Sequence, residues 1–190
     1  MIEIPSDLNP GLVPLAFLLG TWEGAGVSDF PGAEKCNFGQ SVTFSHDGRD
    51  FIEYSSHSWV LDAEGNKVKA LESEHGYWRI DKDRKVEVVM VRDQGVVEVW
   101  YGELADQKPQ IDLATDAVAR TAASGPYSGG KRLYGYVKGD LMWVGEKSTP
   151  DVPLRPYMSA HLKKVVTPEE VASWAKDLGD LPDDGITFFK

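Results

Sequence analysis

The residues of this chain that could do nucleophilic or metal chemistry are few and scattered. It has four histidines and one cysteine, Cys36. Cys36 has no second cysteine for an internal disulfide, and no Cys/His spacing is typical of a zinc site. No Gly-x-Ser-x-Gly segment is present to carry a nucleophilic serine. We therefore expect Cys36 to be a small packed side chain, and we predict neither a zinc site nor a nucleophilic enzyme.

The charge balance restricts the partners that the chain can have. It carries 20 basic and 30 acidic residues, for a net charge of -10 and a pI near 4.8. Nucleic acids and anionic membranes are bound largely through Lys and Arg, so this balance argues against both. It leaves open a small molecule held in a buried pocket.

No segment resembles a leader or a membrane helix. The apolar run at 12–19 is short, is interrupted by Pro14 and has an acidic flank. It falls well below the roughly 18 apolar residues that span a bilayer as a helix. We therefore expect a cytoplasmic protein.

The elements that must position any site are strands. Apolar and polar residues alternate with a period of two, which is typical of strands with one buried face. Short connections rich in Asp, Asn and Gly separate them and favour hairpins. About ten or eleven strands follow one another with no helix between them, which predicts an all-β antiparallel sandwich or closed barrel. The clearest strands are at 42–46, 52–56, 86–90, 97–101, 133–137 and 141–144.

Helix is expected only near the two ends. The segment 12–19 could form a helical turn that closes one mouth of a barrel. The sequence Thr-Pro-Glu-Glu from Thr167 is a capping box with proline at the first helical position, and it predicts a helix over 168–178. We thus divide the chain into a barrel, 1–166, and a helical tail, 167–190. Phe188 and Phe189 would dock on the barrel or on a second subunit, so a homodimer is plausible.

The segment GTWEGAG at 20–26 opens the first strand. We expect Gly20 to let the chain bend out of the mouth-closing helix, and Trp22 to plug the barrel floor. Gly24 and Gly26 share one face of the strand. A bare face there allows either tight strand curvature or close approach of a flat ligand.

This segment resembles the G-x-W-x-G-x-G motif of the nitrobindin family. The resemblance continues in the right order down nearly the whole chain, up to about Asp177. Further blocks similar to the family pattern are VTFSHDG at 42–48, EHGYWRI at 74–80, QGVVEV at 94–99 and AR at 119–120. It implies an antiparallel ten-stranded β-barrel, related to fatty-acid-binding and lipocalin barrels.

The resemblance also implies a chemistry, from which this chain departs at two places. Nitrobindins hold ferric haem b through one histidine on the last strand, bind nitric oxide and isomerise peroxynitrite to nitrate. In the corresponding segment, PLRPYMSAHLKKV at 153–165, the iron-binding position falls on Tyr157. The family's Tyr-Pro-Thr beside the haem is replaced by Phe30-Pro31-Gly32.

Three interpretations of this change remain open. In the first, the barrel has lost the haem ligand and is non-catalytic, or binds another small apolar or planar ligand, with Tyr157 and the 20–26 glycines at its site. In the second, Tyr157 ligates ferric haem as a phenolate, as a tyrosine does in catalase, with Arg155 on the same strand face favouring the phenolate. In the third, His161 replaces the histidine. We expect it on the same strand face as Tyr157, although it lies about 13 Å further along the strand at about 3.3 Å per residue.

A carrier of fatty acids or other lipids is a further class to be weighed. Such barrels hold a carboxylate deep inside with arginine and tyrosine side chains. The pairs available here are Arg79 or Arg120 with Tyr54 or Tyr136. Ordinary ion pairs of these arginines with strand carboxylates are the simpler interpretation.

Overall fold

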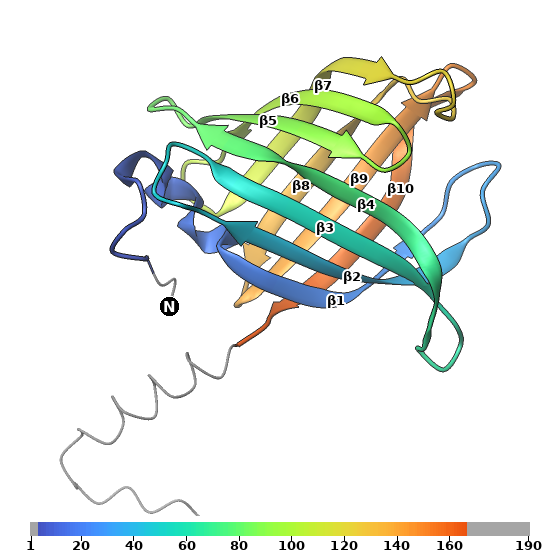
Figure 1. Cartoon of the computed structure of the whole chain (residues 1–190), viewed down its shortest axis with the longest axis horizontal. Helices are drawn as coiled ribbons and strands as arrows, with labels where there is room; N and C mark the ends of the chain where they lie inside the picture. The colour runs from blue at the N-terminus through green and yellow to red at the C-terminus, as the bar shows by residue number, and fades with distance from the viewer. Residues whose placement is uncertain (1–3, 167–190) are drawn as a thin grey trace, which may run out of the picture.

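Ten antiparallel strands close into a barrel in this computed structural model, which describes residues 4–166. Each strand pairs with its neighbours in the chain, and β1 closes on β10 (Figure 1). The predicted ten-stranded barrel is therefore confirmed. The helix expected over 168–178 and the Phe188-Phe189 tail lie outside the described residues. The elements are η1 (Pro10–Leu18), β1 (Gly20–Ser28), β2 (Cys36–Ser45), β3 (Ile52–Leu61), β4 (Lys67–Ile80), β5 (Lys85–Arg92), β6 (Val96–Leu104), β7 (Gln110–Arg120), β8 (Gly129–Val137), β9 (Asp140–Thr149) and β10 (Val152–Lys164).

Side-chain alternation along the strands separates the interior of the barrel from its outer wall. In β5 every second residue is buried, starting with Val86, Val88 and Met90. The fourth buried position of that strand is a charged residue, Arg92. The same alternation in β6 buries Glu98 between Val96 and Trp100. One interior face is thus apolar at one end of the barrel and charged towards the other.

The helical turn η1 closes one end, on the left in Figure 1. Leu15 and Leu18 are fully buried there. Gly20 has a φ of 113°, a left-handed conformation that turns the chain from η1 into β1. Trp22 is buried beneath η1, and its indole Nε1 donates a 2.7 Å hydrogen bond to the Leu18 carbonyl. Gly20 and Trp22 thus lie where the sequence motif predicted an architectural role. Within 4–166 no helix is long and apolar enough to cross a membrane.

Candidate ligand site at the open mouth

The end of the barrel opposite η1 contains a pocket of about 450 Å³. Its walls come from the β1–β2 and β7–β8 connections, which lie at the right of Figure 1, and from β4, the β5–β6 hairpin, the end of β9 and the start of β10. Volumes of this size are typical of sites for small organic molecules. We call it the mouth pocket, and it is lined by Phe30, Pro31, Gly32, Ala33, Glu72, Arg92, Gln94, Val96, Gly125, Pro126, Tyr127, Lys147, Thr149, Asp151 and Val152.

Tyr157 lies in an irregularity of β10. Pro156 pairs with Glu146 and Met158 pairs with Gly145, so Tyr157 is an extra residue between two regular pairs. Both Tyr157 and Met158 are buried. The bare α-carbon of Gly145 leaves room for the phenol ring, since a β-carbon there would lie 2.8 Å from Tyr157 Cε1.

The same irregularity changes which way the rest of β10 faces. Beyond it, Ala160 and Leu162 are buried, whereas His161 is exposed. His161 Nε2 lies 2.5 Å from Asp140 Oδ2 on the outer wall. The expectation that His161 shares the strand face of Tyr157 was therefore wrong, because one inserted residue reverses the alternation.

The Tyr157 hydroxyl faces two arginines. It accepts a hydrogen bond from Arg132 Nη2 at 3.5 Å. Burial raises the pKa of the Tyr157 hydroxyl, and the charges of Arg92 and Arg132 oppose this only in part. Arg155, which was expected to favour the phenolate, is exposed at the rim opposite Lys147. The guanidinium groups near Tyr157 thus belong to residues that the sequence analysis did not select.

Arg132 and Arg92 are held by a buried network of carboxylates and tyrosines. Arg132 Nη1 donates to Glu74 Oε2 at 2.8 Å, and Tyr54 donates to the same oxygen at 2.9 Å. Arg92 Nε donates to Glu98 Oε2 at 2.8 Å. Burial would raise the pKa of the Glu74 carboxyl, but Arg132 and Arg92 outweigh it and lower that pKa to about 2. The Glu74 carboxylate is therefore ionised and paired with the buried Arg132 guanidinium.

A signal for this network was present in the sequence. Arg92 is in phase with Val86, Val88 and Met90, the row of β5 that the period-two pattern predicts to be buried. A charged residue in phase with buried valines must have a buried partner of opposite charge. Glu98 gave no such signal, because it alternates with the apolar residues Val97, Val99 and Tyr101, of which Val97 and Tyr101 are exposed in the structure. The sequence could not predict which residues pair, since Glu74 and Arg132 are 58 positions apart.

The arginines proposed for a fatty-acid carboxylate are not inside the barrel. Arg79 lies on the outer wall, with its guanidinium 5.3 Å from the Phe51 ring centroid. Arg120 is exposed and donates to the Gly125 carbonyl. Tyr136 is partly buried at the closed end, where it packs on Trp22. That expectation was wrong for these pairs. Arg79 falls out of phase with the buried face of β4. Arg120 pairs with the buried Val96, but it lies at the end of β7, where the strand is exposed.

At Gly24 and Gly26 the backbone of β1 lies very close to the backbone of β10. A β-carbon on Gly24 would lie 2.1 Å from the His161 carbonyl oxygen. One on Gly26 would lie 2.1 Å from the Ser159 carbonyl oxygen and 2.6 Å from the Phe38 ring. Neither glycine lines the mouth pocket. Of the two roles expected for them, strand curvature is the one that these contacts support.

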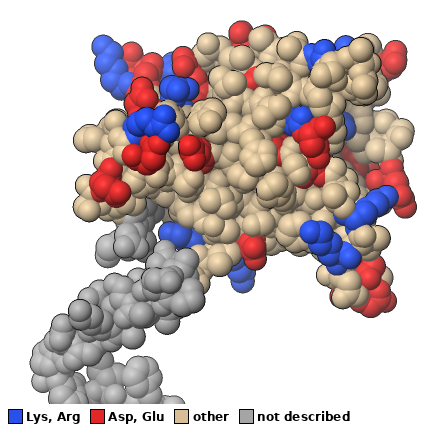
Figure 2. Space-filling view, in the orientation of Figure 1, with Lys and Arg blue, Asp and Glu red and all other residues tan. Residues whose placement is uncertain are grey.

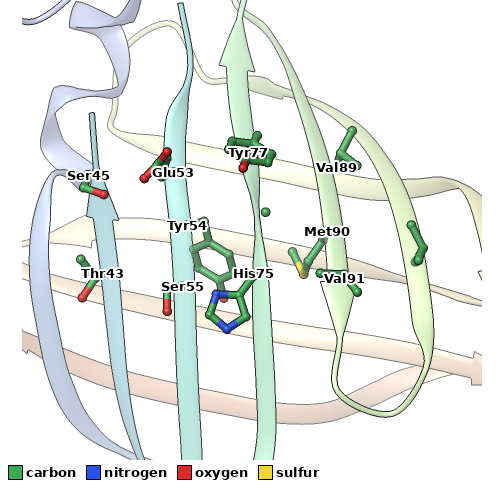
Figure 3. Close-up of a pocket in the computed structure, with 12 residues that line it drawn as sticks. Thr43, Ser45, Glu53, Tyr54, Ser55, His75, Tyr77, Val89, Met90 and Val91 are labelled. Atoms are coloured by element: carbon green, nitrogen blue, oxygen red, sulfur yellow. The ribbon is translucent and has the colours of Figure 1, made fainter. Parts of the chain in front are cut away.

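A second hollow, of about 370 Å³, lies on the outer wall across β2 to β6 (Figure 3). Exposed side chains such as His75, Tyr77 and Val91 surround it, and Gly76 leaves it without a side chain in the middle. Figure 2 shows that charged side chains gather towards the ends of the barrel on this side and are sparse over its middle. Tyr54, which lines the hollow, also donates to Glu74 of the buried network, so the two meet at that residue.

Comparison with known proteins identifies the type of barrel. The model of the "THAP4-like, heme-binding beta-barrel domain" matches residues 11–164. This chain belongs to that family. A "Ferric nitrobindin-like protein" of Streptomyces griseus is 84% identical over the whole of both chains. A "Peroxynitrite isomerase" of Nocardioides is 42% identical over 84% of this chain and 96% of that protein. The crystal structure of Rv2717c from M. tuberculosis superposes with a TM-score of 0.76 at 26% identity, covering 84% of this chain and 99% of that one.

The residues present do not fit the ligation of haem iron that the resemblance to nitrobindins implies. All four histidines lie away from the mouth pocket. His46 is near Asp7 at the closed end, and His161 pairs with Asp140. His57 and His75 meet edge to face on the outer wall, with ring centroids 5.5 Å apart. Tyr157 is buried, and burial favours its protonated hydroxyl over the phenolate that iron would need. Tyr157, at the expected iron position, is thus hydrogen-bonded to Arg132 instead.

Proposed function

We propose that this chain is a haem-independent member of its family that binds a small organic molecule in the mouth pocket and does not catalyse peroxynitrite isomerisation. The observation that carries the proposal is the position of Tyr157. It occupies the place expected for an iron ligand, yet its hydroxyl faces Arg132 and its ring is buried against Gly145. The pocket above it has both apolar walls and charged groups, as sites for small organic molecules do.

A second candidate function is that of a ferric haem protein ligated by Tyr157. The family description and the relatives named as peroxynitrite isomerases favour it. So does the proximity of two arginines, since positive charge favours a phenolate. Against it stands the burial that raises the pKa of the Tyr157 hydroxyl.

A titration with hemin, followed by absorbance in the Soret region, distinguishes the two. We expect only weak binding with a broad band, which Tyr157→Phe leaves unchanged. The variant Tyr157→His introduces the histidine that the resemblance implies and serves as the positive control for haem binding. If the mouth otherwise accommodates haem, this variant will give a sharper band. A sharp, stoichiometric band in the unmodified protein that Tyr157→Phe abolishes would overturn the proposal.

The remaining expectations on partners follow from the sequence. A small molecule is the ligand for which the pocket is suited, whereas the net charge of -10 argues against nucleic acid and anionic membrane. A homodimer and a cytoplasmic location stay predictions. Light scattering at several protein concentrations tests the former.

A further inference from the structure

Lys147 is the cation of the mouth pocket that has no ion-pair partner within the described residues. It extends from β9, and its Nζ lies 4.3 Å from the Phe30 ring centroid and 4.8 Å from the Tyr157 ring centroid. No carboxylate of residues 4–166 lies within 4.0 Å of that nitrogen. The ammonium is therefore held by aromatic rings on one side and open to the pocket on the other.

The other charged groups that line the pocket are already engaged or lie at its edge. Arg92 is paired with Glu98. The Glu72 carboxylate lies 3.7 Å from Arg92 Nη1 and accepts a hydrogen bond from Gln94. Asp151 is exposed in the turn between β9 and β10. Lys147 is thus the charged group of the pocket that can form an ion pair with a ligand.

The walls of the pocket favour a ligand that carries an apolar ring system beside its charged group. Phe30 and Pro31 come from the β1–β2 connection, and Pro126 and Tyr127 from the β7–β8 connection. Val152 adds an aliphatic surface at the start of β10. Aromatic and proline surfaces of this kind bury flat rings well, and a bound ring would exclude water from the ammonium.

We propose that the mouth pocket binds a planar aromatic monoanion, with its acidic group paired to Lys147 Nζ and its ring on the Phe30, Pro31 and Tyr127 surfaces. The inference rests on the proposed function and names its ligand class. Burial lowers the pKa of the Lys147 ammonium, an effect that Glu72 opposes, so the free pocket holds a partly desolvated charge. An anionic ligand compensates that charge, whereas a neutral or cationic ligand does not.

Calorimetric titration with 1-naphthoate and with its neutral analogue 1-naphthalenemethanol tests this on the full chain. We expect naphthoate to bind at least roughly tenfold more tightly, the effect of about one charge-assisted hydrogen bond. Lys147→Met should remove that preference, and Lys147→Arg should retain most of it. Lys163→Met is the matched control, since Lys163 is exposed on β10 near the closed end, and it should change nothing.

Each outcome bears on the inference separately from the proposed function. Equal affinity for the two probes in the unmodified protein overturns the anion preference, while binding in the pocket still stands. Binding of neither probe overturns the inference as well, and the hemin titration then decides the proposed function by itself. A preference that survives in Lys147→Met assigns the anion to another group and overturns the role of Lys147.

Discussion

The two ends of the barrel are built from different chemistry on the same strands. At the closed end, η1 packs fully buried leucines over Trp22, and one indole-to-carbonyl hydrogen bond satisfies the polar atoms of the contact. Towards the open end, the same inward-facing rows carry Arg92, Glu98, Glu74 and Arg132. The closed end therefore gains stability from the removal of apolar surface from water, whereas the open half depends on the pairing of buried charges.

This difference indicates which half is available for function. Buried ion pairs contribute little net stability compared with apolar packing of the same volume. Their presence beside a pocket of about 450 Å³ is therefore better explained by what they do for the mouth, where Arg132 and Arg92 face the Tyr157 hydroxyl. The closed end needs no such explanation, since its packing accounts for it.

The largest loss of stability is expected when one residue of a buried ion pair near the open end is replaced by an uncharged one. Arg132→Met leaves the Glu74 carboxylate buried without its bidentate partner and should lower the free energy of unfolding by about 3–5 kcal/mol. Urea denaturation measures it. The double variant Arg132→Met/Glu74→Leu removes the whole pair and should recover most of the loss. Lys131→Met, an exposed neighbour, is the control. Equal loss in the single and double variants would contradict the view that pairing is what matters here.

A smaller effect is expected at the closed end. Leu15 is fully buried, and Leu15→Ala should cost on the order of 3 kcal/mol through lost transfer energy and a residual cavity. Because the two ends are separated along the strands, the affinity for naphthoate should not change. Urea denaturation and calorimetry on the same preparation check both statements. A change in ligand affinity would show that the ends are coupled.

The smallest effect is a pH dependence that belongs to the charged half alone. The pKa of Glu74 is about 2 in the fold against an ordinary 4.5, so its contribution to stability is present above pH 4.5 and is lost as the pH falls towards 2. We expect a loss on the order of 1–2 kcal/mol between pH 4.5 and pH 3, measured by urea denaturation. Burial raises the pKa of Glu72, so its effect on stability falls above pH 4.5 and has the opposite sign. Measurements below pH 4.5 therefore report mainly on Glu74.

The control for this pH dependence is a variant without the titrating group. Glu74→Gln should have a shallower decline over the same window, although it starts from a lower stability because Arg132 loses its counter-ion. Leu15→Ala should keep the slope of the unmodified protein. An unchanged slope in Glu74→Gln would assign the acid sensitivity to other carboxylates.

Much of the fold could be predicted because it follows from local rules. The period-two alternation located the strands, and the short connections rich in Asp, Asn and Gly located the hairpins. The GTWEGAG segment located the bend at Gly20 and the buried Trp22. Each of these depends on a few neighbouring residues, since the side-chain period of a strand and the conformational freedom of glycine are properties of the backbone.

The candidate site could be predicted only in part. Tyr157 was selected by its place in a family pattern, and it does lie beside the mouth pocket. The expectations for His161 and Arg79 were wrong because each depends on which way a side chain faces, and the expectation for Arg120 was wrong because the end of β7 is exposed. A single extra residue in β10 reverses that direction for every residue after it. Counting along the sequence cannot detect such a residue without knowledge of the pairing.

The sequence by itself determined that this chain is an antiparallel barrel, and it predicted Tyr157 at the position where the resemblance to nitrobindins implies an iron ligand. Only the tertiary structure decided what surrounds that tyrosine. Closure of the barrel brings Arg132 to Glu74 from 58 positions away and to Tyr157 from 25. Contacts at such separations depend on strand register around the whole barrel, and register is fixed by the simultaneous burial of all the inward faces.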